Sequence, residues 1–174
     1  MRKKIRTIIP ILISCVIAFG VITVAWVMQD ATMKGITIRS NTGGVSMLIK
    51  KPTDTEYTDE YVFTEDLTLI PCVKVDASLR SEDDVDVTSN SDYVKEIQMV
   101  VKPSAKVGLY ATVSVDGDLP IKVDCNNVDI TTNTYIQNVN PKDTTLTFHI
   151  WVDGESYTKP DVGNITITLH GEAV

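Results

Sequence analysis

The chain has 174 residues, 43% of them hydrophobic, and a formal net charge of −7. This length suits one domain with a single buried core. Without the basic residues Arg2, Lys3, Lys4 and Arg6, the 16 Lys and Arg fall to 12 against 23 Asp and Glu, a net charge of −11. Such acidity argues against binding to nucleic acid or to an anionic lipid surface.

An apolar stretch of 21 residues without a formal charge, 8–28, follows the basic cluster. As a helix rising about 1.5 Å per residue, it is long enough to cross a hydrocarbon layer of about 30 Å. Basic residues ahead of such a stretch stay in the cytoplasm. We therefore expect a signal peptide or transmembrane anchor at 1–28 and an extracellular domain at 29–174.

Cleavage and retention of this leader both remain open. Thr23-Val24-Ala25 supplies the small residues that precede a signal-peptidase cut, which favours cleavage between Ala25 and Trp26. The apolar run is longer than the 7–15 residues, roughly, of an ordinary signal peptide, which favours a single-pass anchor. The domain is then either secreted or held on the extracellular face of the plasma membrane.

Beyond the leader, apolar and polar residues alternate with the period of β-strands. We expect strands at 35–39, 45–50, 67–75, 94–102, 107–115, 121–124, 134–138, 144–152 and 164–170. The turn residues at 41–44 predict that the first two strands form a hairpin, and Pro71 indicates an edge or bulge in the third. No later segment shows a helical period. The sequence thus predicts an all-β fold, an antiparallel β-sandwich of about seven to nine strands.

Residues 77–92 are rich in Asp, Ser and Glu and nearly free of large apolar side chains. We expect them to form a long exposed loop. Its carboxylates are a candidate calcium site, although the D-x-[DN]-x-[DN]-G spacing of a calcium-binding loop is absent. A solvated acidic loop is the alternative.

Cys72 and Cys125 remain once the leader, which holds Cys15, is removed. They are a candidate disulfide, which would close a loop of about 50 residues and contribute about 4 kcal/mol in an oxidising compartment. Two buried thiols are the alternative, because each cysteine lies in an alternating apolar segment. The chain lacks a C-x-x-C motif and the Cys/His spacing of a zinc site.

Residues 23–38, TVAWVMQDATMKGITI, resemble the start of TasA/camelysin-type exported proteins of Gram-positive bacteria. In that family a small residue and an aromatic end the leader, and an acidic residue and an alternating strand follow. Residues 148–155, FHIWVDGE, and 163–167, GNITI, resemble the closing hairpin of small secreted proteins with such leaders. One departure is that Trp26-Val27-Met28 replaces the common aromatic-aromatic or aromatic-Phe-Thr pattern.

The resemblance implies a jelly-roll-like sandwich, exported through a dedicated signal peptidase. For some members it also implies assembly into extracellular-matrix fibres of the kind found in biofilms, and for others metal-dependent proteolysis. The sequence of this chain gives little indication of catalysis. His149 and His170 are its two histidines, and neither lies in an H-E-x-x-H helix. No serine lies in a G-x-S-x-G turn. We expect no enzymatic activity and no cofactor.

Two further features leave alternatives open. His149 and His170 fall on outward faces of strands expected to be adjacent, so that with Glu155 or Glu172 they could bind a transition metal; two solvated residues are the alternative. Trp151 is also expected to face outward, as a candidate anchor for a partner or a sugar. Packing of Trp151 under a neighbouring loop is the alternative.

After cleavage, residues 26–38 would be a strand-prone N-terminus, with Trp26, Gly35, Ile36 and Ile38 as candidate assembly residues. Pairing with a sheet edge of the next subunit would build a filament. The alternative is pairing within its own domain as an ordinary first strand. The expected partners are other copies or other cell-surface proteins, together with the membrane through the N-terminal segment. A tethered ectodomain that binds a ligand through its loops is the competing function.

Overall fold

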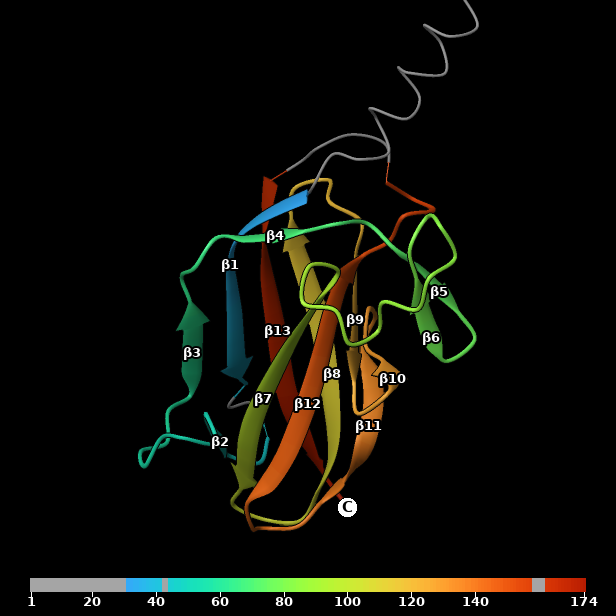
Figure 1. Cartoon of the computed structure of the whole chain (residues 1–174). Coiled ribbons are helices and arrows are strands. Elements are labelled where there is room, and N and C mark those ends of the chain that lie inside the picture. The colour runs from blue at the N-terminus through green and yellow to red at the C-terminus, as the bar shows by residue number, and fades with distance from the viewer. Residues whose placement is uncertain (1–30, 42–43, 158–161) are drawn as a thin grey trace, which may run out of the picture.

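The computed structural model describes residues 31–41, 44–157 and 162–174, which form an all-β fold of two facing sheets (Figure 1). The predicted all-β class is therefore confirmed. This part of the chain holds no helix, and so none with the length and apolar character needed to cross a bilayer. The leader 8–28, with the candidate cleavage residues Ala25 and Trp26, lies outside the described residues.

The strands divide into two main sheets and a separate hairpin. Sheet A has the order β11-β8-β13-β1-β3, with β4 also on β1, and consists of β1 (Ala31–Ser40), β3 (Glu60–Phe63), β4 (Leu67–Leu69), β8 (Val107–Asp116), β11 (Thr134–Val139) and β13 (Val162–Ala173). Sheet B has the order β10-β9-β12-β7-β2 and consists of β2 (Met47–Lys50), β7 (Val94–Pro103), β9 (Ile121–Cys125), β10 (Val128–Asp129) and β12 (Thr144–Val152). The hairpin consists of β5 (Val73–Val75) and β6 (Ser78–Arg80).

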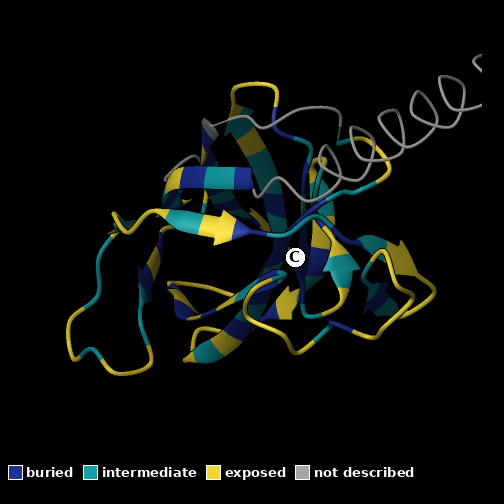
Figure 2. Ribbon diagram, turned by 45° about the horizontal axis from the view of Figure 1, so that its top comes forward, coloured by how far each residue is buried: buried dark blue, intermediate teal, exposed yellow. Residues whose placement is uncertain are grey.

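One apolar core fills the space between sheets A and B. In β12, alternate residues point inward, and Leu146, Phe148 and Ile150 are fully buried. In β1, Met33 and Ile38 fill the same core from the opposite sheet. Figure 2 shows this alternation as buried and exposed bands along the strands. Burial of each such side chain contributes about 1.5–3 kcal/mol, so the alternating pattern determines which face of each strand turns inward.

The predicted hairpin of residues 35–50 is wrong. β1 belongs to sheet A, whereas β2 belongs to sheet B and pairs with β7 from Met47↔Pro103 to Lys50↔Val100. The connection after Ser40 therefore carries the chain from one sheet to the other. A run of turn residues shows where a strand ends, but it does not determine which strand the next one pairs with.

β1 is an inner strand of sheet A although it is the first strand of the domain. It pairs in parallel with β13, from Thr32↔Val162 to Ser40↔Leu169. On its other side it pairs antiparallel with β3 and β4. The other strand pairs within 31–41, 44–157 and 162–174 are antiparallel, so the predicted antiparallel arrangement fails for this one pair.

The strand predicted at 67–75 is split near Pro71. Its first part, β4, pairs with β1, and its second part, β5, pairs with β6 outside both main sheets. β3 and β10 were not predicted, because four and two residues are too few to show an alternation. The described residues thus form sheets of six, five and two strands, more than the seven to nine expected.

Gly163 offers a test of the packing beside the β1–β13 pair. It pairs with Met33 of β1, and a Cβ placed on it would overlap the carbonyl oxygen of Asp116. Gly163→Ala should therefore lower the free energy of unfolding by about 1–3 kcal/mol, the usual cost of overpacking, as measured by denaturant unfolding.

The matched control is Gly108→Ala in β8, where the nearest atoms to a new Cβ are side-chain carbons at 3.4 Å or more. This change should cost much less. Equal losses in the two variants would contradict the close approach of the backbone at Gly163.

Candidate functional site

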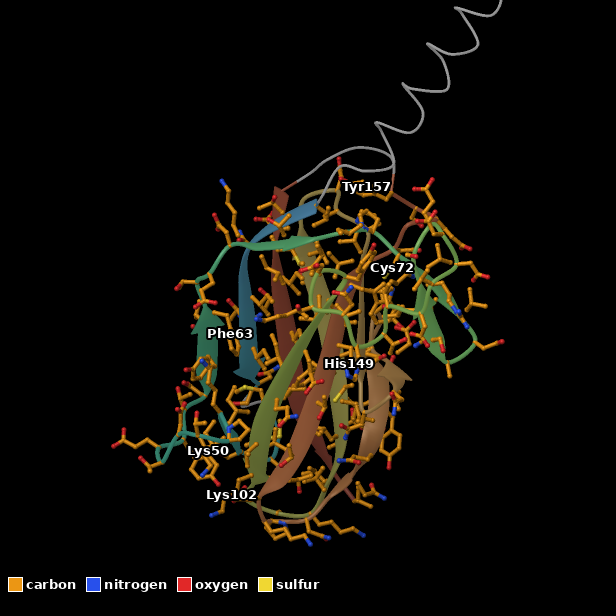
Figure 3. The ribbon with its side chains drawn as sticks, in the orientation of Figure 1. Lys50, Phe63, Cys72, Lys102, His149 and Tyr157 are labelled. Carbon is orange, nitrogen blue, oxygen red and sulfur yellow. The ribbon has the colours of Figure 1, made fainter. Side chains whose placement is uncertain are left out.

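A row of ionisable side chains crosses the outer face of sheet B. His149 in β12 lies directly opposite Glu96 in β7 on one side and Asp124 in β9 on the other. Because Phe148 and Ile150 point into the core, the alternation of the strand turns His149 outward, as the sequence predicts. Figure 3 shows His149 on β12. Three strands of one sheet thus bring a histidine between two carboxylates.

Asp124 is the buried member of this row. Its side chain is 9% exposed, and its Oδ1 lies 2.9 Å from Nδ1 of His149. Its other oxygen lies 3.6 Å from Nζ of Lys74. Nε2 of His149 lies 3.8 Å from Glu96. A buried carboxylate needs such partners to offset its lost hydration, and the two partners of Asp124 meet that need.

Lys74 ties the β5–β6 hairpin to sheet B. It comes from β5, and besides its contact with Asp124 its Nζ lies 5.1 Å from the centre of the Trp151 ring. An ammonium group at this distance from an aromatic face is attracted by the ring electrons. Through Lys74, this row of side chains also links the β5–β6 hairpin to sheet B.

Trp151 is only 2% exposed, which corrects the expectation of a surface anchor. Its side chain packs with Cys72, Leu79, Val87 and Val94 in an apolar cluster separate from the main core. Residues 70–93, named here the arm, cover the Trp151 ring. The alternative prediction, that Trp151 packs under a neighbouring loop, is therefore confirmed. Trp151 therefore holds the arm on sheet B.

The arm corrects the expectation of a wholly exposed loop at 77–92. It contains β6, and Leu79 and Val87 within it are each 4% exposed. The Val87 backbone N–H donates to the Leu79 carbonyl oxygen at 2.8 Å, and the Leu79 N–H donates to the Thr88 hydroxyl at 2.8 Å. Two apolar residues among many polar ones are enough to order the segment, because both reach the same cluster.

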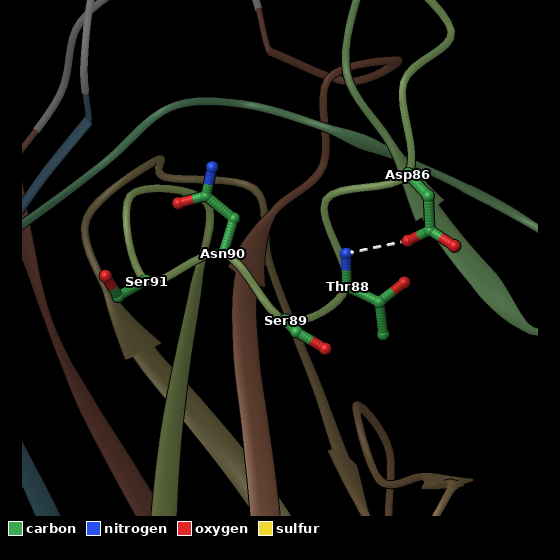
Figure 4. A pocket seen from close by; sticks show the side chains of 5 residues that line it. All are labelled: Asp86, Thr88, Ser89, Asn90 and Ser91. Carbon is green, nitrogen blue, oxygen red and sulfur yellow. Dashed lines mark hydrogen bonds between the residues drawn. The ribbon is translucent and has the colours of Figure 1, made fainter.

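A shallow polar hollow lies at one turn of the arm (Figure 4). Oδ1 of Asp86 accepts a hydrogen bond from the Thr88 N–H at 3.0 Å, and this bond holds the pKa of Asp86 below its usual value. Oδ1 of Asp84 lies 4.0 Å from Nε of Arg80. In the part of the chain that the structure describes, no three His, Cys, Asp or Glu side chains are grouped to hold a metal ion. The geometry thus gives the calcium interpretation no support.

The two histidines lie in different sheets, which corrects the expectation that their strands are adjacent. β12 belongs to sheet B and β13 to sheet A. The His170 ring stacks on Tyr110 with the ring centres 5.3 Å apart. The closing hairpin that the resemblance implies for 148–155 and 163–167 is therefore not formed, because β12 and β13 belong to opposite sheets. A metal site built on His149 and His170 therefore cannot form in this fold.

The candidate assembly residues of the N-terminal strand lie within the domain itself. Ile36 is 3% and Ile38 0% exposed, and both belong to the main core. Gly35 lies at the bulge where β1 pairs with Asn164 of β13. Residues 31–38 thus form a strand of their own subunit, whereas Trp26 lies outside the described residues.

Cys72 and Cys125 are free thiols, so the candidate disulfide is not formed. Cys125 belongs to the main core and Cys72 to the cluster around Trp151. Burial raises the pKa of each thiol to about 12, with a smaller contribution from Asp153 at Cys72 and from Asp124 at Cys125. Thiols with such pKa values are protonated at neutral pH and are poor nucleophiles.

Both thiols should therefore resist iodoacetamide at neutral pH in the folded domain, residues 29–174, and react only after denaturation. Intact mass spectrometry before and after denaturation measures the number of alkyl groups added. Rapid alkylation of the folded protein would contradict the burial of these residues. A denatured, non-reduced protein that takes up no alkyl group would show that the two cysteines are bridged.

Comparisons with known proteins do not assign this chain to a family. No family model matches it, and a search of the curated proteins finds no match. The resemblance at residues 23–38 and 148–155 therefore stays a prediction from those residues.

Proposed function

We propose that the chain is an exported cell-surface protein that acts by contact, as a structural subunit of the extracellular matrix, and not by catalysis. One observation carries the proposal. Ala31, the first residue that the structure describes, is already paired in sheet A, and it lies three residues beyond the apolar stretch that ends at Met28. Only Gln29 and Asp30 therefore separate the apolar stretch from the folded domain in the sequence.

This arrangement limits where the domain can fold. Because β1 pairs with β13 along most of its length, both ends of the domain must lie on the same side of any membrane. Because Ala31 is already paired with Leu69 of β4, the membrane boundary must fall before Ala31. A basic N-terminus followed by an apolar stretch directs the rest of the chain outward. The proposed location is therefore secreted or on the extracellular face of the plasma membrane.

We also propose that the fold is a jelly-roll-like β-sandwich, as the resemblance to TasA/camelysin-type proteins implies. Seven connections support it by passing directly from one main sheet to the other: β1 to β2, β2 to β3, β7 to β8, β8 to β9, β10 to β11, β11 to β12 and β12 to β13. Such crossings are typical of sandwiches whose strands alternate between layers.

The proposed contact is self-association through the N-terminal segment. Cleavage after Ala25 would leave residues 26–30 as a short, mostly apolar extension of β1. An extended segment of this kind gains affinity by adding to a sheet edge through main-chain hydrogen bonds. A contact between the extension of one copy and a different surface of the next does not close on itself, so it builds a fibre.

The intact mass of the extracellular protein tests the first step. We expect a species that lacks residues 1–25, because cleavage after Ala25 frees Trp26. Ala25→Phe should block processing by removing the small residue that the peptidase requires. A full-length mass for the unaltered protein would instead favour the permanently tethered ectodomain.

Electron microscopy of the concentrated mature protein tests the second step. The cleaved protein should form filaments, and the Ala25→Phe protein should not. A cleaved protein that stays monodisperse and monomeric at every concentration would refute the role as a fibre subunit.

A further inference from the structure

Lys74 contacts the least exposed carboxylate that any lysine reaches in the part of the chain that the structure describes. Nζ of Lys74 and Oδ2 of Asp124 lie 3.6 Å apart, and the Asp124 side chain is only 9% exposed. The other such contacts, those of Lys50 and Lys102 with Asp143, are 4.0 Å long and use a carboxylate that is 51% exposed. The Lys74–Asp124 pair is therefore both closer and better enclosed than the others.

The two oxygens of Asp124 have different partners. Oδ2 faces Lys74, whereas Oδ1 lies 2.9 Å from Nδ1 of His149, and Nε2 of the same ring lies 3.8 Å from Glu96. The ring of Trp151, which is 2% exposed, has its centre 5.1 Å from Nζ of Lys74. An amine, a carboxyl group and an imidazole that can transfer a proton thus meet beside a buried aromatic ring.

We propose that Lys74 and Asp124 condense to an amide, an isopeptide bond that ties the arm covalently to β9. The reaction is a single event within the chain and not the turnover of a substrate. It needs no external reagent, because both reacting groups are side chains of the protein. The bond requires neither export nor assembly, and so it goes beyond the proposed function.

The atoms of this reaction balance with the loss of one water. A bond forms between Nζ of Lys74 and the carboxyl carbon of Asp124, and the bond from that carbon to Oδ1 breaks. Of the three protons of the ammonium group, one stays on the amide nitrogen and two leave with Oδ1 as water. His149 is the general acid for this departure, because its Nδ1 contacts Oδ1. The proton that His149 gives is replaced by one that Lys74 releases.

Burial and proximity both favour the condensation. A proton must first pass from the ammonium group to the carboxylate, and neutralising an ion pair costs less where water is excluded than at the surface. Well-oriented groups within one molecule react at effective concentrations of roughly 10⁵–10⁸ M. The fold supplies this orientation, because the apolar cluster around Trp151 anchors the arm and β9 is paired within sheet B. Condensation therefore follows folding.

The mass of the folded full chain tests the bond. We expect a mass lower by one water than that calculated for the residues present, and peptide mass spectrometry should join residue 74 to residue 124. Lys74→Arg, which keeps the positive charge, should show the full calculated mass. The matched control is Lys122→Arg. Lys122 lies opposite Trp151 and lines the same pocket as Lys74, and its replacement should leave the loss of water unchanged.

His149→Gln tests the role of the histidine. Glutamine keeps a polar group at this position but cannot transfer a proton, so the loss of water in newly synthesised protein should slow by about 100-fold. The mass of the protein, followed over time after synthesis, measures this rate. An unchanged rate would overturn the role of His149 as the general acid.

Two results would overturn the isopeptide bond itself. A folded protein that keeps the full calculated mass after prolonged incubation would show that the pair stays an ion pair; the protection of Cys72 and Cys125 from alkylation verifies that this protein is folded. A loss of water that persists in Lys74→Arg would arise at another site. Either result leaves the proposed function intact, because cleavage of the leader and filament formation are measured separately.

Discussion

The parallel pairing of β1 with β13 is the interaction on which the rest of the domain depends. It joins the first described strand to the last, and β1 in turn carries β3 and β4 on its other side. Without β1, sheet A would lose the strand that connects its two halves, and the main core would lose Met33, Ile36 and Ile38. The entropy of closing so long a loop grows only slowly with its length, so buried apolar surface can offset it.

This pairing has consequences for export. A fold whose ends must meet cannot complete sheet A until the whole domain has been delivered, and such non-local pairing is slow. In the proposed location, the chain would have to fold after translocation, with both ends on the same side of the membrane. Because only Gln29 and Asp30 separate the apolar stretch 8–28 from Ala31, the proposed cleavage after Ala25 would leave five residues ahead of an inner strand. Proposed function and fold thus depend on the same strand.

A second, smaller core organises the outer face of sheet B. Trp151, Cys72 and Leu79 attach the arm through apolar contacts, and Lys74 adds its contact with Asp124. Glu96, His149 and Asp124 lie side by side on three neighbouring strands and contact one another across sheet B.

The sequence predicts where strands lie far better than which strands pair. Residues 144–152 show a clean alternation, and β12 occupies the same range. Pairing depends on residues far apart in the chain, which a local pattern does not show. The turn residues at 41–44 therefore predict a hairpin at a place where the chain passes from one sheet to the other. Trp151 was misplaced because its cover comes from Leu79 and Val87, which a local pattern cannot bring to it. The point at which the pairing of β2 with β7 ends, Val100, could not be predicted either, because it depends on two strands far apart in the chain.

Hydrogen exchange of the monomeric extracellular protein at β1 tests the central claim most directly. Peptides that cover 31–40 and 162–173 should exchange slowly and at matching rates, because both strands open only when the domain unfolds. Rapid exchange at 31–40 beside continued protection at 162–173 would show that the first strand is not held in sheet A, and would contradict the account.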